Sequence, residues 1–130
     1  MTSQIDPETE SSFPPLDVAP VLHVRLARRA GVLARRALAL RVSCERGCKV
    51  LVTATLLPGA GRRRVRLIPL ARSLPRAAPG HVRLRVGPSA LRRLRRALGR
   101  RSGMFASVKI VAAGPTGRRT TLVRSYDVRR

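Results

Sequence analysis

Residues 38–57 read LALRVSCERGCKVLVTATLL, and this stretch decides the fold. Apolar residues alternate with other residues on both sides of the short segment from Cys44 to Cys48. A period of two places successive side chains on opposite faces of a strand. The sequence therefore predicts two strands joined as a hairpin, with Gly47 in the turn and one face of each strand in the core.

The same alternation recurs along the chain and predicts five more strands. They are expected at residues 21–26, 65–68, 81–86, 104–112 and 119–128. In the last of them Arg124 falls on the same face as Leu122 and Tyr126, so a bulge is expected there. Residues 70–80, which include Pro75 and Pro79, are expected to form a loop.

One helix is expected, over residues 89–98, where Leu91, Leu94 and Leu98 recur at spacings of three and four. Ser89 is a candidate cap and Gly99 ends the pattern. A helix is conceivable over residues 27–37, but Gly31 and the missing caps favour a crossing or bent edge segment there. Seven short strands with one late helix predict an all-β antiparallel sandwich, because a parallel α/β fold would need helices between most strands.

The two ends of the chain differ in composition. Residues 1–19 are acidic and Pro-rich, and they are expected to form a disordered leader. They lack the basic start and apolar stretch of a signal peptide. Residues 20–130 are long enough for one domain, and no run of about 18 apolar residues predicts a membrane span.

The net charge of the chain is +22, and only two of its 28 basic residues are lysine. A surplus this large favours polyanion binding, but the arginines are spread through every element, as the codon usage of a GC-rich genome would also produce. Both interpretations remain open. The candidate anion-binding residues are Arg62, Arg63, Arg64, Arg92, Arg93, Arg95, Arg96, Arg100 and Arg101.

Cys44 and Cys48 are the only two cysteines. Their three-residue separation differs from a thioredoxin-type redox motif, and two thiols supply half the ligands of a structural zinc. A structural disulfide is preferred over free thiols, and it would indicate an oxidising compartment. No metal or cofactor is expected. Acidic, serine and histidine residues show no spacing typical of a catalytic site, so no enzymatic activity is expected.

Three stretches together are similar to a known class of domain. LALRVSCERGCKVLVTATLL, HVRLRVGPSALRRLRRAL and FASVKIVAAGPTGRRTTLVRSYDVRR resemble the Arg-rich Ig-like or fibronectin-III-like modules of secreted and surface proteins from high-GC bacteria. The resemblance covers residues 20–130. It implies an Ig-like β-sandwich that serves as a spacer or interaction domain and has no active site.

The expected function is a non-catalytic structural or adhesion module of an extracellular or cell-envelope protein. Its expected partners are envelope polyanions or other domains of the same protein. The alternative is non-specific binding of nucleic acid or another polyanion through the Arg-rich surface.

Overall fold

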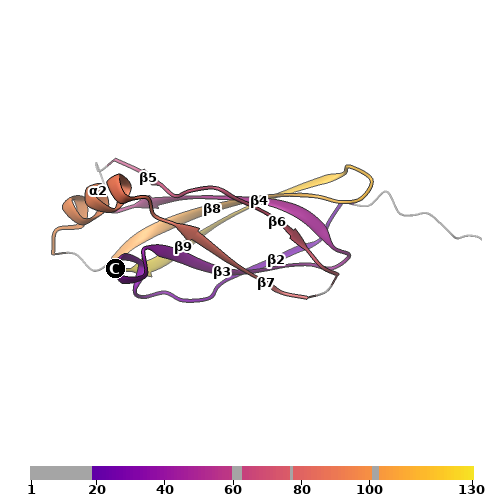
Figure 1. Cartoon of the computed structure of the whole chain (residues 1–130), viewed down its shortest axis with the longest axis horizontal. Helices are drawn as coiled ribbons and strands as arrows, with labels where there is room; N and C mark the ends of the chain where they lie inside the picture. Colours follow the sequence, from indigo (N-terminus) through magenta and orange to yellow (C-terminus); the bar gives the residue numbers. More distant parts are fainter. Residues whose placement is uncertain (1–18, 60–62, 77, 101–102) are drawn as a thin grey trace, which may run out of the picture.

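Two antiparallel β-sheets lie face to face in this chain, with a helix at one end of the long axis (Figure 1). The coordinates are a computed structural model and describe residues 19–59, 63–76, 78–100 and 103–130. The predicted leader, residues 1–19, lies outside the described part except for its last residue. The all-β, two-sheet architecture predicted from the sequence is confirmed.

The smaller sheet has three strands in the order β2-β3-β7. Its strands are β2 (Leu22–Leu26), β3 (Ala37–Cys44) and β7 (Gly80–Arg85). Both of its pairings are antiparallel, and β2 lies at an edge as its short alternating pattern indicates.

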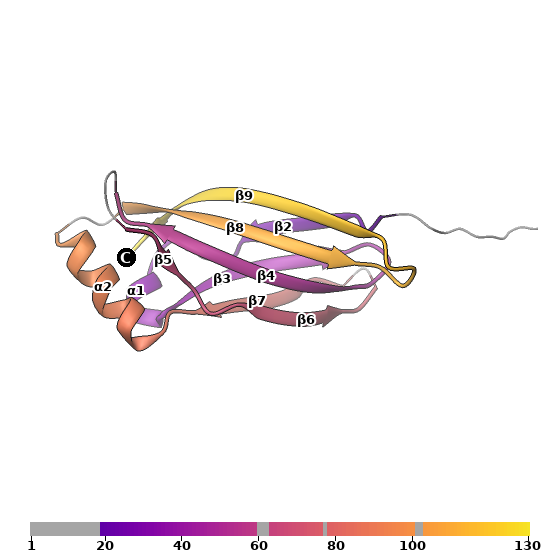
Figure 2. The ribbon, with the colours of Figure 1, turned by 90° about the horizontal axis from the view of Figure 1, so that it is seen from above.

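The larger sheet has five strands, with β4 and β8 at its centre. Its strands are β4 (Cys48–Leu57), β5 (Val65–Arg66), β6 (Leu70–Leu74), β8 (Gly103–Ala113) and β9 (Arg119–Arg129). Strand β8 pairs with one side of β4, while β5 and β6 share its other side. Figure 2 shows the long β4, β8 and β9 running side by side.

Alternate residues of both sheets fill the space between them. The predicted inward faces of β3, β4, β7 and β8 are all buried, and α2 adds its leucines at one end. The core is aliphatic; its central members are Leu38, Leu40, Val42, Val50, Val52, Leu56, Val82, Leu84, Leu94, Val108 and Ile110. Burying such side chains stabilises the fold by about 1.5–3 kcal/mol each before entropy is counted.

The hairpin predicted around Gly47 is wrong. Strand β3 pairs with β2 and β7, while β4 pairs with β5, β6 and β8, so the turn between Cys44 and Cys48 carries the chain from one sheet to the other. The alternation of apolar residues determines which face of a strand is buried. It does not determine which strand lies beside it, and a short turn permits either arrangement.

Two further segments differ from the prediction. Residues 70–74, expected as loop, form strand β6, because the backbone of Leu70–Leu74 pairs with Cys48–Val52 although its middle residues are exposed. The described part therefore has eight strands where seven were expected. Helix α1 (Val32–Arg35) is a single turn that buries Val32 and Leu33 within the predicted bent segment.

The bulge predicted in β9 is also wrong. Strands β8 and β9 keep an unbroken register from Gly103↔Arg129 to Ala113↔Arg119. Arg124 has the same inward register as Leu122, yet it is exposed, because β9 ends the sheet and a hollow of about 470 Å³ separates it from β2. An open edge accommodates the charge without a change of register.

Helix α2 (Pro88–Leu98) covers the end of the sandwich beside β5. Leu91, Leu94 and Leu98 are buried, as their spacing predicts. The predicted cap is wrong: Gly87 is the N-cap residue and Ser89 lies inside the helix. At the other end, the Gly99 N–H donates to Arg95 O at 3.1 Å, which confirms where the helix ends.

The described ends of the chain lie at opposite tips of the sandwich (Figure 1). At one tip, Thr120 Oγ1 donates a hydrogen bond to Pro20 O beside the β8–β9 turn. At the other, the Gly31 N–H donates to Arg130 O at 3.0 Å.

Candidate anion-binding surface and the cysteine pair

A shallow groove at the α2 end is lined by four of the predicted arginines. Arg63 and Arg64 precede β5, and Arg93 and Arg96 lie on the exposed face of α2. The groove has a volume of about 210 Å³, and Val65 and Ala97 form its apolar floor. Helix α2 turns its leucines to the core, which leaves its arginines facing solvent.

The pairing of β5 with β4 places the two segments side by side. Val65 is 2% exposed, and its strand pairs with Thr55 and Leu56 at the end of β4. This anchor holds the preceding arginines next to α2. The sequence left open whether the helix and the basic turn share one side, and in the structure they do.

The other predicted arginines are less closely grouped. Arg92, Arg95 and Arg100 are exposed on or just after α2, but none of them lines the groove. Arg62 and Arg101 lie outside the described residues.

Few acidic groups are present to neutralise this surface. After residue 18 the chain contains 28 basic residues and only two acids, Glu45 and Asp127. Glu45 Oε2 lies 3.0 Å from His23 Nε2, within hydrogen-bonding distance. Asp127 is exposed on β9, so neither acid lies against the α2 groove.

Cys44 ends β3 and Cys48 begins β4, so the two thiols face each other across the turn that joins the sheets. Both side chains are buried, and the sulfurs are not bonded to each other. Burial raises the pKa of the Cys48 thiol to about 12, with a hydrogen bond to Cys44 and the charge of that group adding to the effect. The disulfide itself stays a prediction.

The backbone conformation of this turn explains why residue 47 is a glycine. The Gly47 N–H donates to Cys44 O at 3.2 Å, and Gly47 has φ 76°, a left-handed conformation that glycine adopts without steric cost. Sulfur atoms at these two positions would join the sheets to each other if they were oxidised.

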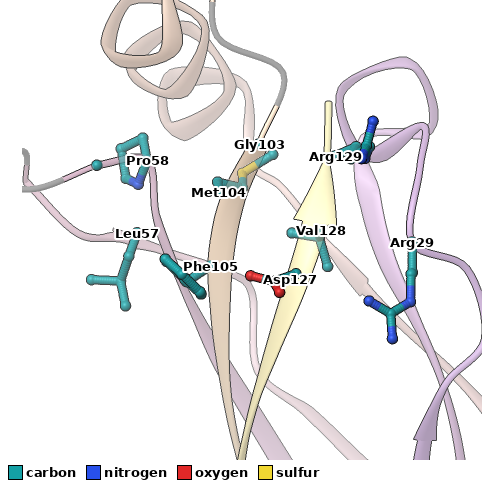
Figure 3. Close-up of a pocket in the computed structure, with 10 residues that line it drawn as sticks. Arg29, Leu57, Pro58, Gly103, Met104, Phe105, Asp127, Val128 and Arg129 are labelled. Carbon is teal, nitrogen blue, oxygen red and sulfur yellow. The ribbon is translucent and has the colours of Figure 1, made fainter.

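A larger hollow, of about 560 Å³, lies near the C-terminal end of β9 (Figure 3). Phe105 and Asp127 lie together on one side of β9, whereas Arg29 belongs to the loop on its other side. Among the described residues, Asp127 is the one acid that lines the hollow, and no histidine lines it with Asp127 to form an acid–base pair.

Within residues 19–59, 63–76, 78–100 and 103–130 no group of three or more His, Cys, Asp or Glu side chains could hold a metal ion. Neither described helix is long and apolar enough to cross a bilayer.

One cluster of arginines was not predicted from the sequence. Arg35, Arg36, Arg83 and Arg85 line a hollow of about 360 Å³ where α1 meets β7. Two pairs almost fifty residues apart in sequence meet there because β7 pairs with β3. Only the order of strands in the sheet shows that these two arginine pairs are neighbours. The alternation of apolar residues does not determine that order.

Comparisons with known proteins assign this chain to no family. No protein-family model matches the sequence, and no curated protein is similar to it. Among solved structures, the solution structure of AT1g01470 from Arabidopsis thaliana is similar with 17% sequence identity and a TM-score of 0.43. The match covers 89% of this chain and 82% of that one. A likeness of this size does not assign a function.

Proposed function

We propose that this chain is a non-catalytic interaction domain that binds polyanions independently of their sequence. The observation that carries the proposal is the groove in which Arg63 and Arg64 lie beside Arg93 and Arg96, and which no acid of the described residues lines. Guanidinium groups form paired hydrogen bonds with phosphate oxygens. The polyanion best suited to such a surface is the phosphate backbone of duplex nucleic acid.

The aromatic residues support binding without base recognition. Tyr126 packs against the core, and Phe105 lies on the outer face of the larger sheet and does not line the α2 groove. Phe13 lies outside the described residues. Stacking of unpaired bases needs aromatic side chains beside the charges, and the groove has none.

Titration of a duplex DNA at several salt concentrations tests this proposal. Four phosphate contacts predict a slope of about −4 in a plot of log K against log salt. The double variant Arg93→Ala/Arg96→Ala is expected to reduce the magnitude of the slope by about 2. A slope near zero, or a variant that binds like the parent, contradicts the proposal.

A matched control removes the same charge elsewhere. Lys49 and Arg119 are exposed in one cross-strand row with Ala113, at the tip opposite α2. The variant Lys49→Ala/Arg119→Ala is expected to keep the slope of the parent chain within about 0.5. Equal losses in the two variants would show that net charge alone, and no particular surface, attracts the DNA.

A second candidate function is a structural or adhesive module of the cell envelope, with an Ig-like or fibronectin-III-like sandwich. Two observations favour it: the stacked antiparallel sheets, and the adjacent buried cysteines that an oxidising compartment would join. Its partners would be envelope polyanions or neighbouring domains of the same protein.

Mass spectrometry of the protein isolated from its native host tests the second candidate. Because the thiols are buried, the chain is unfolded in denaturant with an alkylating reagent and without reductant. An oxidised pair gains no alkyl group until reductant is added. Two alkyl groups gained before reduction would remove the argument for an oxidising compartment.

A further inference from the structure

The hollow between α1 and β7 has the features of a discrete oxyanion site. Arg35 and Arg36 enter it from the end of α1, and Arg83 and Arg85 enter it from β7. The remaining wall is mostly apolar or backbone; it is formed by Ala37, Ile68, Val86, Gly87 and Pro88. All four arginine side chains are exposed, so a ligand can reach them from solvent.

The register of β3 and β7 places these charges together. Arg83 lies opposite Ala39 and Arg85 lies opposite Ala37, so each long side chain has a small neighbour on the adjacent strand. Of these two small neighbours, Ala37 lines the hollow. Two residues along a strand cover about 6.6 Å, which is short enough for both β7 guanidinium groups to reach one anion.

Hydrogen bonds connect the α1 side of the hollow to the β7 side. Arg83 Nη2 donates to Arg35 O at 3.2 Å, and the Val86 N–H donates to Arg36 O at 2.8 Å. The first bond uses one N–H of the Arg83 guanidinium and leaves other donors for a ligand. The relative position of the two arginine pairs is therefore fixed before any anion binds.

Arg36 adds an independent observation. It has φ 56°, and it is the only residue other than glycine with a positive φ in the described part. Its N–H caps α1 by donating to Leu33 O and Val32 O. Glycine would fill this cap at less steric cost, so an arginine here indicates that its side chain is used.

Neither acid of the described residues lies at this site. Glu45 is paired with His23 and Asp127 lies on the larger sheet, and neither lines this hollow. Four guanidinium groups around one small volume repel one another. A compact anion with several acceptor oxygens relieves that repulsion and accepts paired hydrogen bonds.

We propose that the hollow lined by Arg35, Arg36, Arg83 and Arg85 binds one phosphate group, as inorganic phosphate or a phosphomonoester. This pocket is distinct from the α2 groove, and its occupancy does not depend on DNA binding. The dianionic, tetrahedral form of the group matches a ring of donors better than a monoanionic diester does.

Calorimetric titration with inorganic phosphate, at constant ionic strength held with chloride, tests the proposal. We expect saturable binding of one phosphate per chain. Dimethyl phosphate, a monoanionic diester, is expected to bind at least about tenfold more weakly, since one charge-assisted contact accounts for a factor of that order. Binding that does not saturate, or equal binding of the diester, overturns the assignment.

The variant Arg36→Gly separates binding from stability. Glycine accepts the backbone conformation of residue 36. The melting temperature of the variant is therefore expected to equal or exceed that of the parent chain. Its phosphate affinity is expected to fall about tenfold, the loss of one charge-assisted contact. A variant that stays folded and keeps the parent affinity contradicts the proposal.

A double variant and its control complete the test. Arg83→Gln/Arg85→Gln is expected to abolish measurable phosphate binding, while Arg93→Ala/Arg96→Ala is expected to change it less than about twofold. The second variant weakens DNA binding if the proposed function is correct, so the two proposals fail separately. Equal losses of phosphate affinity in both variants would show that phosphate binding depends on the net charge and not on this pocket.

Discussion

Tyr126 illustrates how a single side chain can be placed well for packing and badly for hydrogen bonding. Its ring packs against the core from β9, but its hydroxyl is buried and has no hydrogen-bond partner among the described residues. Burial raises the pKa of the phenol, because the phenolate would lose its hydration. The hydroxyl therefore costs stability in the native state.

The variant Tyr126→Phe is expected to unfold at higher denaturant concentration, with a gain of about 1 kcal/mol from removing an unsatisfied buried hydroxyl. The parent chain should also lose stability as the pH rises above about 10, the ordinary pKa of tyrosine, because only the unfolded phenol ionises readily there. The variant should lack this part of the pH dependence. Urea unfolding monitored by circular dichroism measures both effects.

Thr120→Val is the matched control for this prediction. The Thr120 hydroxyl has a partner, since it donates to Pro20 O at 2.6 Å. Losing that hydrogen bond is expected to lower the free energy of unfolding by about 1 kcal/mol, whereas Tyr126→Phe is expected to raise it. A Tyr126→Phe variant that loses as much stability as Thr120→Val would show that the phenol is hydrogen-bonded after all.

The turn between β3 and β4 shows what a pattern of residues predicts about an element and what it does not. Alternation correctly predicted the buried face of both strands, including Cys44 and Cys48. It could not predict that they enter different sheets, because the partner of a strand depends on contacts distant in sequence. Strand β6 was missed for a related reason: its pairing with β4 makes it a strand, although its own residues resemble a loop.

Gly47→Ala is expected to destabilise this turn by about 1–2 kcal/mol, the cost of a left-handed conformation for a residue with a Cβ. A Cβ at Gly47 would also lie 3.3 Å from Leu74 O, a close contact with backbone. Gly117 has a similar φ of 85° but open space around it. Gly117→Ala should therefore cost less than Gly47→Ala in chemical denaturation.

Equal losses in the two glycine variants would mean that conformation alone sets the cost. A Gly47→Ala variant as stable as the parent chain would contradict the turn geometry described here.

Across the whole molecule, the arrangement of charge was the least predictable property. The sequence showed the surplus of arginine and grouped Arg63 and Arg64 with Arg93 and Arg96 as candidates, conditional on the helix and turn sharing one side. It gave no indication that two distant Arg pairs would meet between α1 and β7. The surplus itself, 28 basic residues against two acids after residue 18, opposes a compact state throughout.

Adding sodium chloride to a low-salt solution is expected to raise the melting temperature of the parent chain, because screening weakens this repulsion. A gain of about 1 kcal/mol in the free energy of unfolding corresponds to a rise of about 3–5 °C in the melting temperature of a domain of this size. The variant Lys49→Glu/Arg119→Glu, which lowers the net charge by four, should respond less to salt. A melting temperature that falls with added chloride would show that attractive ion pairs dominate the native state.

The position of the two described ends has a mechanical consequence. Pro20 is held at one tip and Arg130 at the other, so traction between them runs along the strands. The load on β9 would be shared by its whole eleven-residue ladder with β8 at once, instead of opening one rung after another. A ladder loaded in this direction is expected to resist stretching, because all of its backbone hydrogen bonds must break together.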